Sequence, residues 1–274
     1  MNLHIVSQGT ARADQHELVF IHGWGLSGRI WQSLIDRLSP RFRCHAVDLP
    51  GHGASKPGPV GLNNWADSLA DTLAESVQKP TVCVGWSLGG LVTLSLARRH
   101  PERLAAAVLV ASLPRMVRSR DWAWGLAPAA IEQTRQGLAG DYATTVSEFL
   151  MQQVLGEPGA ARAVRSLRSD LIDQPPSRAG LERGLDILHD TDLRTALAAL
   201  SLPTLWVAGA RDRMAHPAGM DWAARQMTGA GYWPVERAAH APFVSHERRF
   251  AERVTAFVDE LARSRPQPAG EIRP

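Results

Sequence analysis

The segment Thr81–Ala97, TVCVGWSLGGLVTLSLA, decides the fold. It begins with an apolar run that is typical of a buried strand, and from Leu88 onward its apolar residues recur at helical spacing. At the junction, Gly85-Trp86-Ser87-Leu88-Gly89 matches the pattern G-x-S-x-G. A strained turn of this kind raises a serine hydroxyl above the edge of a sheet. Ser87 is therefore the candidate nucleophile, and the alternative is a serine that only caps the following helix.

Strand and helix patterns alternate on both sides of this segment. Short apolar runs predict strands at Leu18–His22, His45–Leu49 and Ala106–Ala111. Amphipathic spacing predicts helices at Ile30–Leu38 and Leu62–Val77. Continuous apolar strands separated by helices predict an α/β fold, in which a mostly parallel sheet is covered by helices on both faces.

The alternation stops after residue 113 and resumes after residue 190. Residues 114–190 show only helical or loop patterns, whereas Leu202–Gly209 and, weakly, Gly231–Val235 again predict strands, followed by a last helix over Arg248–Arg263. We expect a core of residues 1–113 and 191–274, a helical cap of residues 114–190, and a disordered tail from about residue 264. A cap inserted over the carboxyl ends of parallel strands would lie where ligands bind in such folds.

A serine hydroxyl needs a base to accept its proton, and the base needs a carboxylate to orient it. When the serine lies at a strand–turn–helix junction, the expected order along the chain is serine, then acid, then histidine. Asp212 follows the strand predicted at Leu202–Gly209, and His240 follows the last weak strand, so we assign them as acid and base. The alternatives are Glu236 and Asp190 for the acid, and His216 and His246 for the base.

Two backbone N–H groups are needed to hold the oxyanion that forms when a serine attacks a carbonyl. One is expected from Leu88, the residue after the nucleophile, and the other from a loop after an earlier strand. His22-Gly23-Trp24-Gly25 matches that loop, with Trp24 supplying the N–H. The indole of Trp24 either walls the acyl pocket or packs as an ordinary core side chain.

A competing motif overlaps this loop. Gly23-Trp24-Gly25-Leu26-Ser27-Gly28 matches G-x-G-x-x-G after a strand, and Asp48 ends the next strand, as in a dinucleotide-binding fingerprint. That interpretation leaves Ser87, Asp212 and His240 without a role, so we rank it below the hydrolytic one.

The composition bears on nucleic-acid binding, on the state of the cysteines and on metal binding. The 274 residues carry 30 basic and 27 acidic side chains, a net charge of +3, which is too balanced for a dedicated nucleic-acid binder. Cys44 and Cys83 lie in apolar runs and are expected to be buried free thiols. The histidines lack the H-E-x-x-H spacing of a metal site, so we expect no metal and no cofactor.

No targeting segment is visible in the sequence. The N-terminus lacks a cationic start with an apolar stretch, and the run Leu104–Leu113 is too short to span a bilayer. We therefore expect a cytoplasmic monomer with no membrane partner.

Four segments together resemble the α/β-hydrolase superfamily, namely HGWGLSGRIW, VDLPGHGAS, GWSLGGLVTLSLA and AAHAPFVSH. More narrowly, they resemble the pimeloyl-[acyl-carrier protein] methyl ester esterase family of biotin synthesis. The similarity covers most of residues 18–258 and is weaker in the cap, where GLDILHDTDLR is its clearest segment. The resemblance implies an α/β-hydrolase fold and a serine esterase that demethylates a dicarboxylyl chain carried on acyl carrier protein.

The resemblance also implies that one cap segment lines the acyl channel: Phe149, Leu150, Met151, Gln152 and Gln153. Judged from the residues alone, the apolar side chains of this region either wall a chain-length pocket or pack the cap onto the core; they are Phe149, Met151, Val154 and Leu155. A basic stripe follows, formed by Arg162, Arg165 and Arg168. It either contacts the acidic carrier or its phosphopantetheine phosphate, or is a solvated helix face.

The predicted reaction is hydrolysis of the methyl ester of pimeloyl-acyl-carrier protein through an acyl-enzyme, with release of methanol. The expected partner is an ester linked to acyl carrier protein or a small-molecule ester. Three alternatives stay open: a general short-acyl carboxylesterase, an enol-lactone or C–C bond hydrolase on the same scaffold, and a non-catalytic ligand-binding protein.

Overall fold

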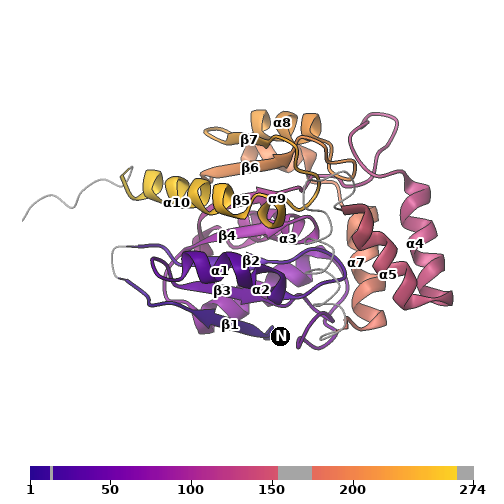
Figure 1. The fold of residues 1–274 in the computed structure, drawn as a ribbon, viewed down its shortest axis with the longest axis horizontal. Coiled ribbons are helices and arrows are strands. Elements are labelled where there is room, and N and C mark those ends of the chain that lie inside the picture. Colours follow the sequence, from indigo (N-terminus) through magenta and orange to yellow (C-terminus); the bar gives the residue numbers. More distant parts are fainter. Residues whose placement is uncertain (13–14, 154–174, 264–274) are drawn as a thin grey trace, which may run out of the picture.

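A computed structural model describes residues 1–12, 15–153 and 175–263, and its centre is one seven-stranded sheet in the order β1-β3-β2-β4-β5-β6-β7 (Figure 1). Only β1 is antiparallel to its neighbour, and every other adjacent pair is parallel. The strands are β1 (Ile5–Gln8), β2 (Leu18–Ile21), β3 (Cys44–Val47), β4 (Thr81–Trp86), β5 (Leu104–Val110), β6 (Thr204–Gly209) and β7 (Gly231–Val235). The predicted α/β fold with a mostly parallel sheet is confirmed.

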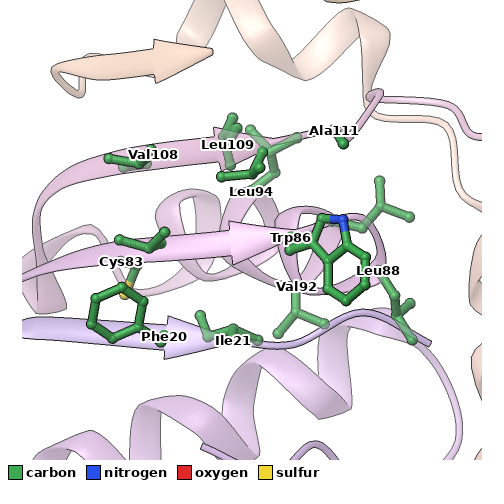
Figure 2. Packing of buried hydrophobic residues seen from close by; sticks show 14 of the residues in the cluster. Phe20, Ile21, Cys83, Trp86, Leu88, Val92, Leu94, Val108, Leu109 and Ala111 are labelled. Atoms are coloured by element: carbon green, nitrogen blue, oxygen red, sulfur yellow. The ribbon is translucent and has the colours of Figure 1, made fainter. Parts of the chain in front are cut away.

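The central strands are apolar on both faces because helices cover both sides of the sheet. Every residue of β2, β4 and β6 is buried, and the side chains of neighbouring strands interleave in the core (Figure 2). The register pairs Ile21 with Gly85 and Trp86 with Val110, so the carboxyl ends of β2, β4 and β5 lie level. The loops that follow these strands therefore meet at one edge of the sheet.

The helices arise from segments with apolar residues three and four positions apart. In α10, for example, Phe250, Val254, Phe257 and Val258 are buried while the opposite face is polar. Among the core helices, α1 contacts α10 and α2 contacts α3. The helices are α1 (Gln32–Leu38), α2 (Leu62–Ser76), α3 (Leu88–Arg99), α4 (Pro128–Gly140), α5 (Tyr142–Gln153), α7 (Arg178–Asp190), α8 (Pro217–Gln226), α9 (Pro242–Ser245) and α10 (Glu247–Arg263).

The chain between β5 and β6 contains α4, α5 and α7, which stand together beside one end of the sheet (Figure 1). The two ends of this connection meet, because the Leu193 N–H donates to the Pro114 carbonyl at 2.8 Å. Helix α7 lies on the loop that follows β2, where the Trp24 indole N–H donates to the Leu181 carbonyl at 2.9 Å. The stretch from Trp122 to Leu126 is a loop held by two isolated β-bridges.

Strand β1 and the helices α8 and α9 were not predicted from the sequence. Strand β1 is a short polar edge strand in which Val6 is exposed, so it lacks the apolar run that marks the central strands. Helix α8 follows Asp212 and is capped by His216, whose ring nitrogen accepts from the Ala218 N–H. Cys44 and Cys83 are free and buried, as expected. Among the described residues, no helix is both long enough and apolar enough to cross a bilayer.

Candidate active site

Ser87 occupies a strained turn between β4 and α3. Its backbone has φ 54° and ψ −115°, in the left-handed region that residues with a side chain rarely adopt. The two motif glycines allow this turn. A Cβ atom on Gly85 would lie 2.5 Å from the Gly89 carbonyl oxygen, and one on Gly89 would lie 2.4 Å from that of Ile21. The turn therefore requires glycine at both positions.

Hydrogen bonds from β5 fix the Ser87 backbone. The Ser87 N–H donates to the Val110 carbonyl, and the Ser112 hydroxyl donates to the Ser87 carbonyl, both at 2.9 Å. Ser87 itself is 6% exposed. Ser112 lies just beyond β5 and did not stand out in the sequence, because no motif marks a serine that bonds to the backbone of another strand.

The side chains of Asp212 and His240 form a buried pair. Asp212 Oδ2 lies 2.8 Å from His240 Nδ1, and both side chains are almost completely excluded from solvent. The other carboxylate oxygen accepts from the N–H groups of Met214 and Ala215, at 2.8 and 3.0 Å. The loop after β6 thus holds the carboxylate rigidly through its own backbone.

This pairing determines which nitrogen of His240 is basic. A carboxylate only accepts hydrogen bonds, so Nδ1 carries the proton and Nε2 keeps a lone pair. His240 Nε2 is buried and has no hydrogen-bond partner within the part of the chain that the structure describes. An imidazole arranged in this way is suited to accept a proton from a nearby hydroxyl.

None of the four alternative residues has comparable surroundings. Glu236 is exposed, and Asp190 is exposed and paired with His189 at 2.6 Å. His216 is exposed and caps α8. His246 is half-buried beside Ser245, and burial is the main reason its pKa is lowered.

The loop after β2 is held by His22 and packs against α5 and α7. His22 Nδ1 lies 2.7 Å from the Gly23 carbonyl, and its Nε2 accepts from the Leu49 N–H at 2.9 Å. Trp24 is 1% exposed and its ring lies 4.6 Å from that of Phe149. Leu88 begins α3, where amide groups have no acceptor within the helix.

The competing dinucleotide motif has a structural explanation. Asp48 is 2% exposed, and its carboxylate accepts from the N–H groups of Gly28 and Ala54 at 2.7 and 2.9 Å. The ring of His4 contacts the same carboxylate at 2.8 Å. The carboxylate therefore joins its own loop to the loop after β2 and to the N-terminal segment, and its hydrogen bonds are used within the protein.

The residues predicted to line the acyl channel differ in burial: Phe149 is buried, whereas Met151 is exposed. Phe149 packs against Trp24, and together with Gln152 it lines a cavity of about 190 Å³ between α4 and α5. Met151 is 46% exposed. Several of the predicted cap residues or their side chains lie outside the described part of the structure: Leu150, Gln153, Val154, Leu155, Arg162, Arg165 and Arg168.

Comparisons with known proteins agree with this geometry. A model of the alpha/beta hydrolase family matches residues 18–253. A pimeloyl-[acyl-carrier protein] methyl ester esterase from Xanthomonas campestris pv. campestris (strain B100) is 38% identical, over 95% of this chain and 100% of its own length. The esterase of the same name from Pectobacterium carotovorum subsp. carotovorum (strain PC1) is 40% identical, over 90% and 96%.

Solved structures show the same fold at lower identity. A thermophilic esterase from Thermogutta terrifontis aligns with a TM-score of 0.81 and 23% identity, over 95% of this chain and 94% of its own. An enol-lactonase from Burkholderia xenovorans LB400 aligns with a TM-score of 0.83 and 20% identity, over 94% and 96%. The match to the family model and the full-length relatives lead to one conclusion: the chain belongs to the alpha/beta hydrolase family.

Proposed function

We propose that this protein is a serine esterase that hydrolyses the methyl ester of pimeloyl-acyl-carrier protein in biotin biosynthesis. The observation that carries the chemistry is the buried Asp212–His240 pair, whose basic Nε2 has no partner among the described residues. The substrate is supported by the names of full-length relatives that are 38% and 40% identical to this chain.

In the proposed mechanism, Ser87 attacks the ester carbonyl while His240 accepts its proton. The N–H groups of Trp24 and Leu88 hold the oxyanion of the tetrahedral intermediate. The protonated His240 then donates to the departing methoxide, which leaves as methanol. Water attacks the acyl-enzyme with His240 again as base, and this step releases the free carboxylate and restores Ser87. Asp212 keeps His240 in the required tautomer throughout.

We also propose that the chain is divided into a catalytic core and a cap. Residues 1–113 and 191–274 would form the catalytic core, and residues 114–190 a cap that covers the acyl group. The contacts of Trp24 with Phe149 and with the Leu181 carbonyl support this arrangement, because they bring α5 and α7 onto the loop after β2 that carries Trp24, here called the oxyanion loop. We assign the basic stripe of Arg162, Arg165 and Arg168 to contact with the acidic carrier.

The first test is the Ser87→Ala variant. Turnover of p-nitrophenyl esters should fall by about a millionfold, as expected when the nucleophile of a serine hydrolase is removed. The matched control is Ser68→Ala, which removes a buried serine hydroxyl that donates to the Asn64 carbonyl within α2, away from this turn, and should leave turnover unchanged. Full activity in Ser87→Ala would exclude Ser87 as the nucleophile.

The substrate requires a separate test. The wild-type gene should restore growth of a biotin auxotroph that lacks this esterase, whereas the Ser87→Ala gene should not. Purified enzyme should release methanol from methyl pimeloyl-acyl-carrier protein. Hydrolysis of free short-chain esters alone would favour a general carboxylesterase.

A further inference from the structure

The indole of Trp86 connects parts of the proposed catalytic site that lie far apart in the sequence. Trp86 is the last residue of β4 and directly precedes Ser87. Its indole N–H donates to the His240 carbonyl at 2.8 Å, and the side chain is completely buried. Figure 2 shows the Trp86 ring among other buried residues of the core. The residue before the nucleophile is therefore bonded to the backbone of the proposed base.

The same ring also contacts the oxyanion loop. A Cβ atom on Gly23 would lie 3.0 Å from the Trp86 ring, so the backbone next to Trp24 rests on the indole. On its other sides, the ring lies 5.8 Å from that of His240 and 5.0 Å from that of Phe243. One rigid side chain thus touches the loops that follow β2 and β7 and belongs to the strand that carries Ser87.

We propose that Trp86 is a positioning residue that sets the place of His240 relative to Ser87. The proposal rests on the proposed function, because it assigns Trp86 a role in the reaction of that same site. The contacts of Trp86 that carry this role are with the His240 carbonyl, with the His240 ring and with the Gly23 backbone. It acts on the site through these contacts, as a positioning residue.

The physical reason lies in how the His240 loop is anchored. On the β6 side, the Arg211 N–H donates to the Ala238 carbonyl at 2.8 Å, so the loop is already held two residues before His240. The Trp86 bond adds an anchor at His240 itself. Catalytic proton transfer depends steeply on geometry, and a displacement of about 1 Å costs on the order of a hundredfold in rate.

The test is the Trp86→Phe variant, which keeps an aromatic ring and removes the indole N–H. We expect kcat for p-nitrophenyl esters to fall between about tenfold and a hundredfold, with KM changed less than about twofold. The rate of Ser87 labelling by a fluorophosphonate should fall in parallel, because that reaction also requires His240 as base. The final extent of labelling should remain complete.

Two control variants separate positioning from loss of stability. Trp65→Phe removes an equally buried indole that donates to the Pro59 carbonyl at 3.0 Å, at a site without proposed catalytic residues. Trp206→Phe removes a buried indole whose N–H has no partner among the described residues. Both should lower the melting temperature while leaving kcat within about twofold of wild type. If Trp86→Phe does not fold, 3-benzothienylalanine at position 86 removes the N–H and keeps the ring shape.

The outcomes distinguish this proposal from the proposed function. A wild-type enzyme without Ser87-dependent esterase activity would overturn the proposed function itself. If the wild type is active and Ser87→Ala is not, a Trp86→Phe enzyme with the kcat of Trp65→Phe would overturn the positioning role. A loss of kcat that is confined to position 86, with KM and the extent of labelling preserved, supports it.

Discussion

At the residue scale, the candidate site depends on close backbone contacts that are possible only where the residue is glycine and has no Cβ atom. Gly85 and Gly89 lie so close to neighbouring backbone that an added Cβ would overlap it. Ser87 stays in the left-handed region because hydrogen bonds to Val110 and Ser112 hold its N–H and carbonyl. Strain of this kind persists only where the surrounding structure over-determines it, which is the situation at this turn.

His52 is a single residue that affects the pH dependence of stability and has no proposed role in catalysis. It is completely buried, and its ring lies 5.2 Å from that of His22 and 6.1 Å from that of Trp65. Burial, with a smaller contribution from His22, lowers the pKa of His52 to about 3. In the unfolded chain the pKa of a histidine is about 6.5. The folded state therefore favours the neutral ring.

The sign of the pH dependence follows from this difference. Above pH 6.5 His52 is neutral in both the folded and the unfolded state, so it does not change the free energy of unfolding with pH. Between pH 6.5 and 3 the unfolded chain binds a proton that the native protein does not, so stability is lost as the pH falls, by at most about 1.4 kcal/mol per pH unit. In His52→Asn this contribution should disappear.

Urea unfolding of wild type and His52→Asn at several pH values between 7 and 4 would measure the effect. The variant should lose less stability on acidification than the wild type. His246→Asn is the control, because His246 is only half-buried and should change the slope less. Equal slopes for wild type and His52→Asn would contradict the assignment.

At the scale of elements, the first turn of α7 is hydrogen-bonded to the loop that contains Gly51. Ser177 caps the helix by accepting from the Gly180 N–H, and its hydroxyl donates to the Gly51 carbonyl at 3.0 Å. The Ser177 N–H donates to the same carbonyl at 2.7 Å. A Cβ on Gly51 would lie 2.6 Å from Gly180 Cα, so helix and loop are in direct backbone contact.

Ser177→Ala removes both side-chain hydrogen bonds and leaves the backbone contact. We expect the free energy of unfolding to fall by about 1 kcal/mol, the usual cost of losing a helix cap. The control is Thr134→Ala, whose hydroxyl bonds only to Ala130 within α4. Chemical denaturation checks the prediction. A stability of Ser177→Ala equal to that of the control would show that the backbone contact alone holds α7.

At the scale of the whole molecule, the connection from β5 to β6 begins and ends at nearly the same place. The Leu193 N–H donates to the Pro114 carbonyl, and Arg115 and Asp192 pair at 2.8 Å. Arg194 bonds to Asp192 as well, and this is the main reason the pKa of Asp192 is lowered to about 2. Because its ends are adjacent, this connection can be shortened without pulling β5 and β6 apart.

We therefore expect a chain in which residues 115–192 are replaced by a short Gly-Ser linker to keep its sheet. Stability should fall, because Trp24 loses the cover of α5 and α7 and is exposed to water. Circular dichroism and cooperative thermal unfolding would report the folded core. An unfolded product would contradict the division into core and cap that we propose.

How much could be predicted differs from one residue to another. Strands β2 and β4 are visible as continuous apolar runs because they are buried on both faces. Strand β1 is not visible, since an edge strand with an exposed valine has no distinctive pattern. Asp212 and His240 follow from chain order, and the structure brings them together at 2.8 Å.

The sequence by itself determined the alternating sheet, the glycine turn at Ser87 and the order of the candidate catalytic residues. These depend on local spacing and on residue types within a few positions, which a chain displays directly. Only the tertiary structure decided that Trp86 bonds to His240, 154 residues away, and that Asp48 accepts from the Gly28 N–H of the loop after β2. Contacts of this kind arise from packing between distant segments, so no local pattern records them.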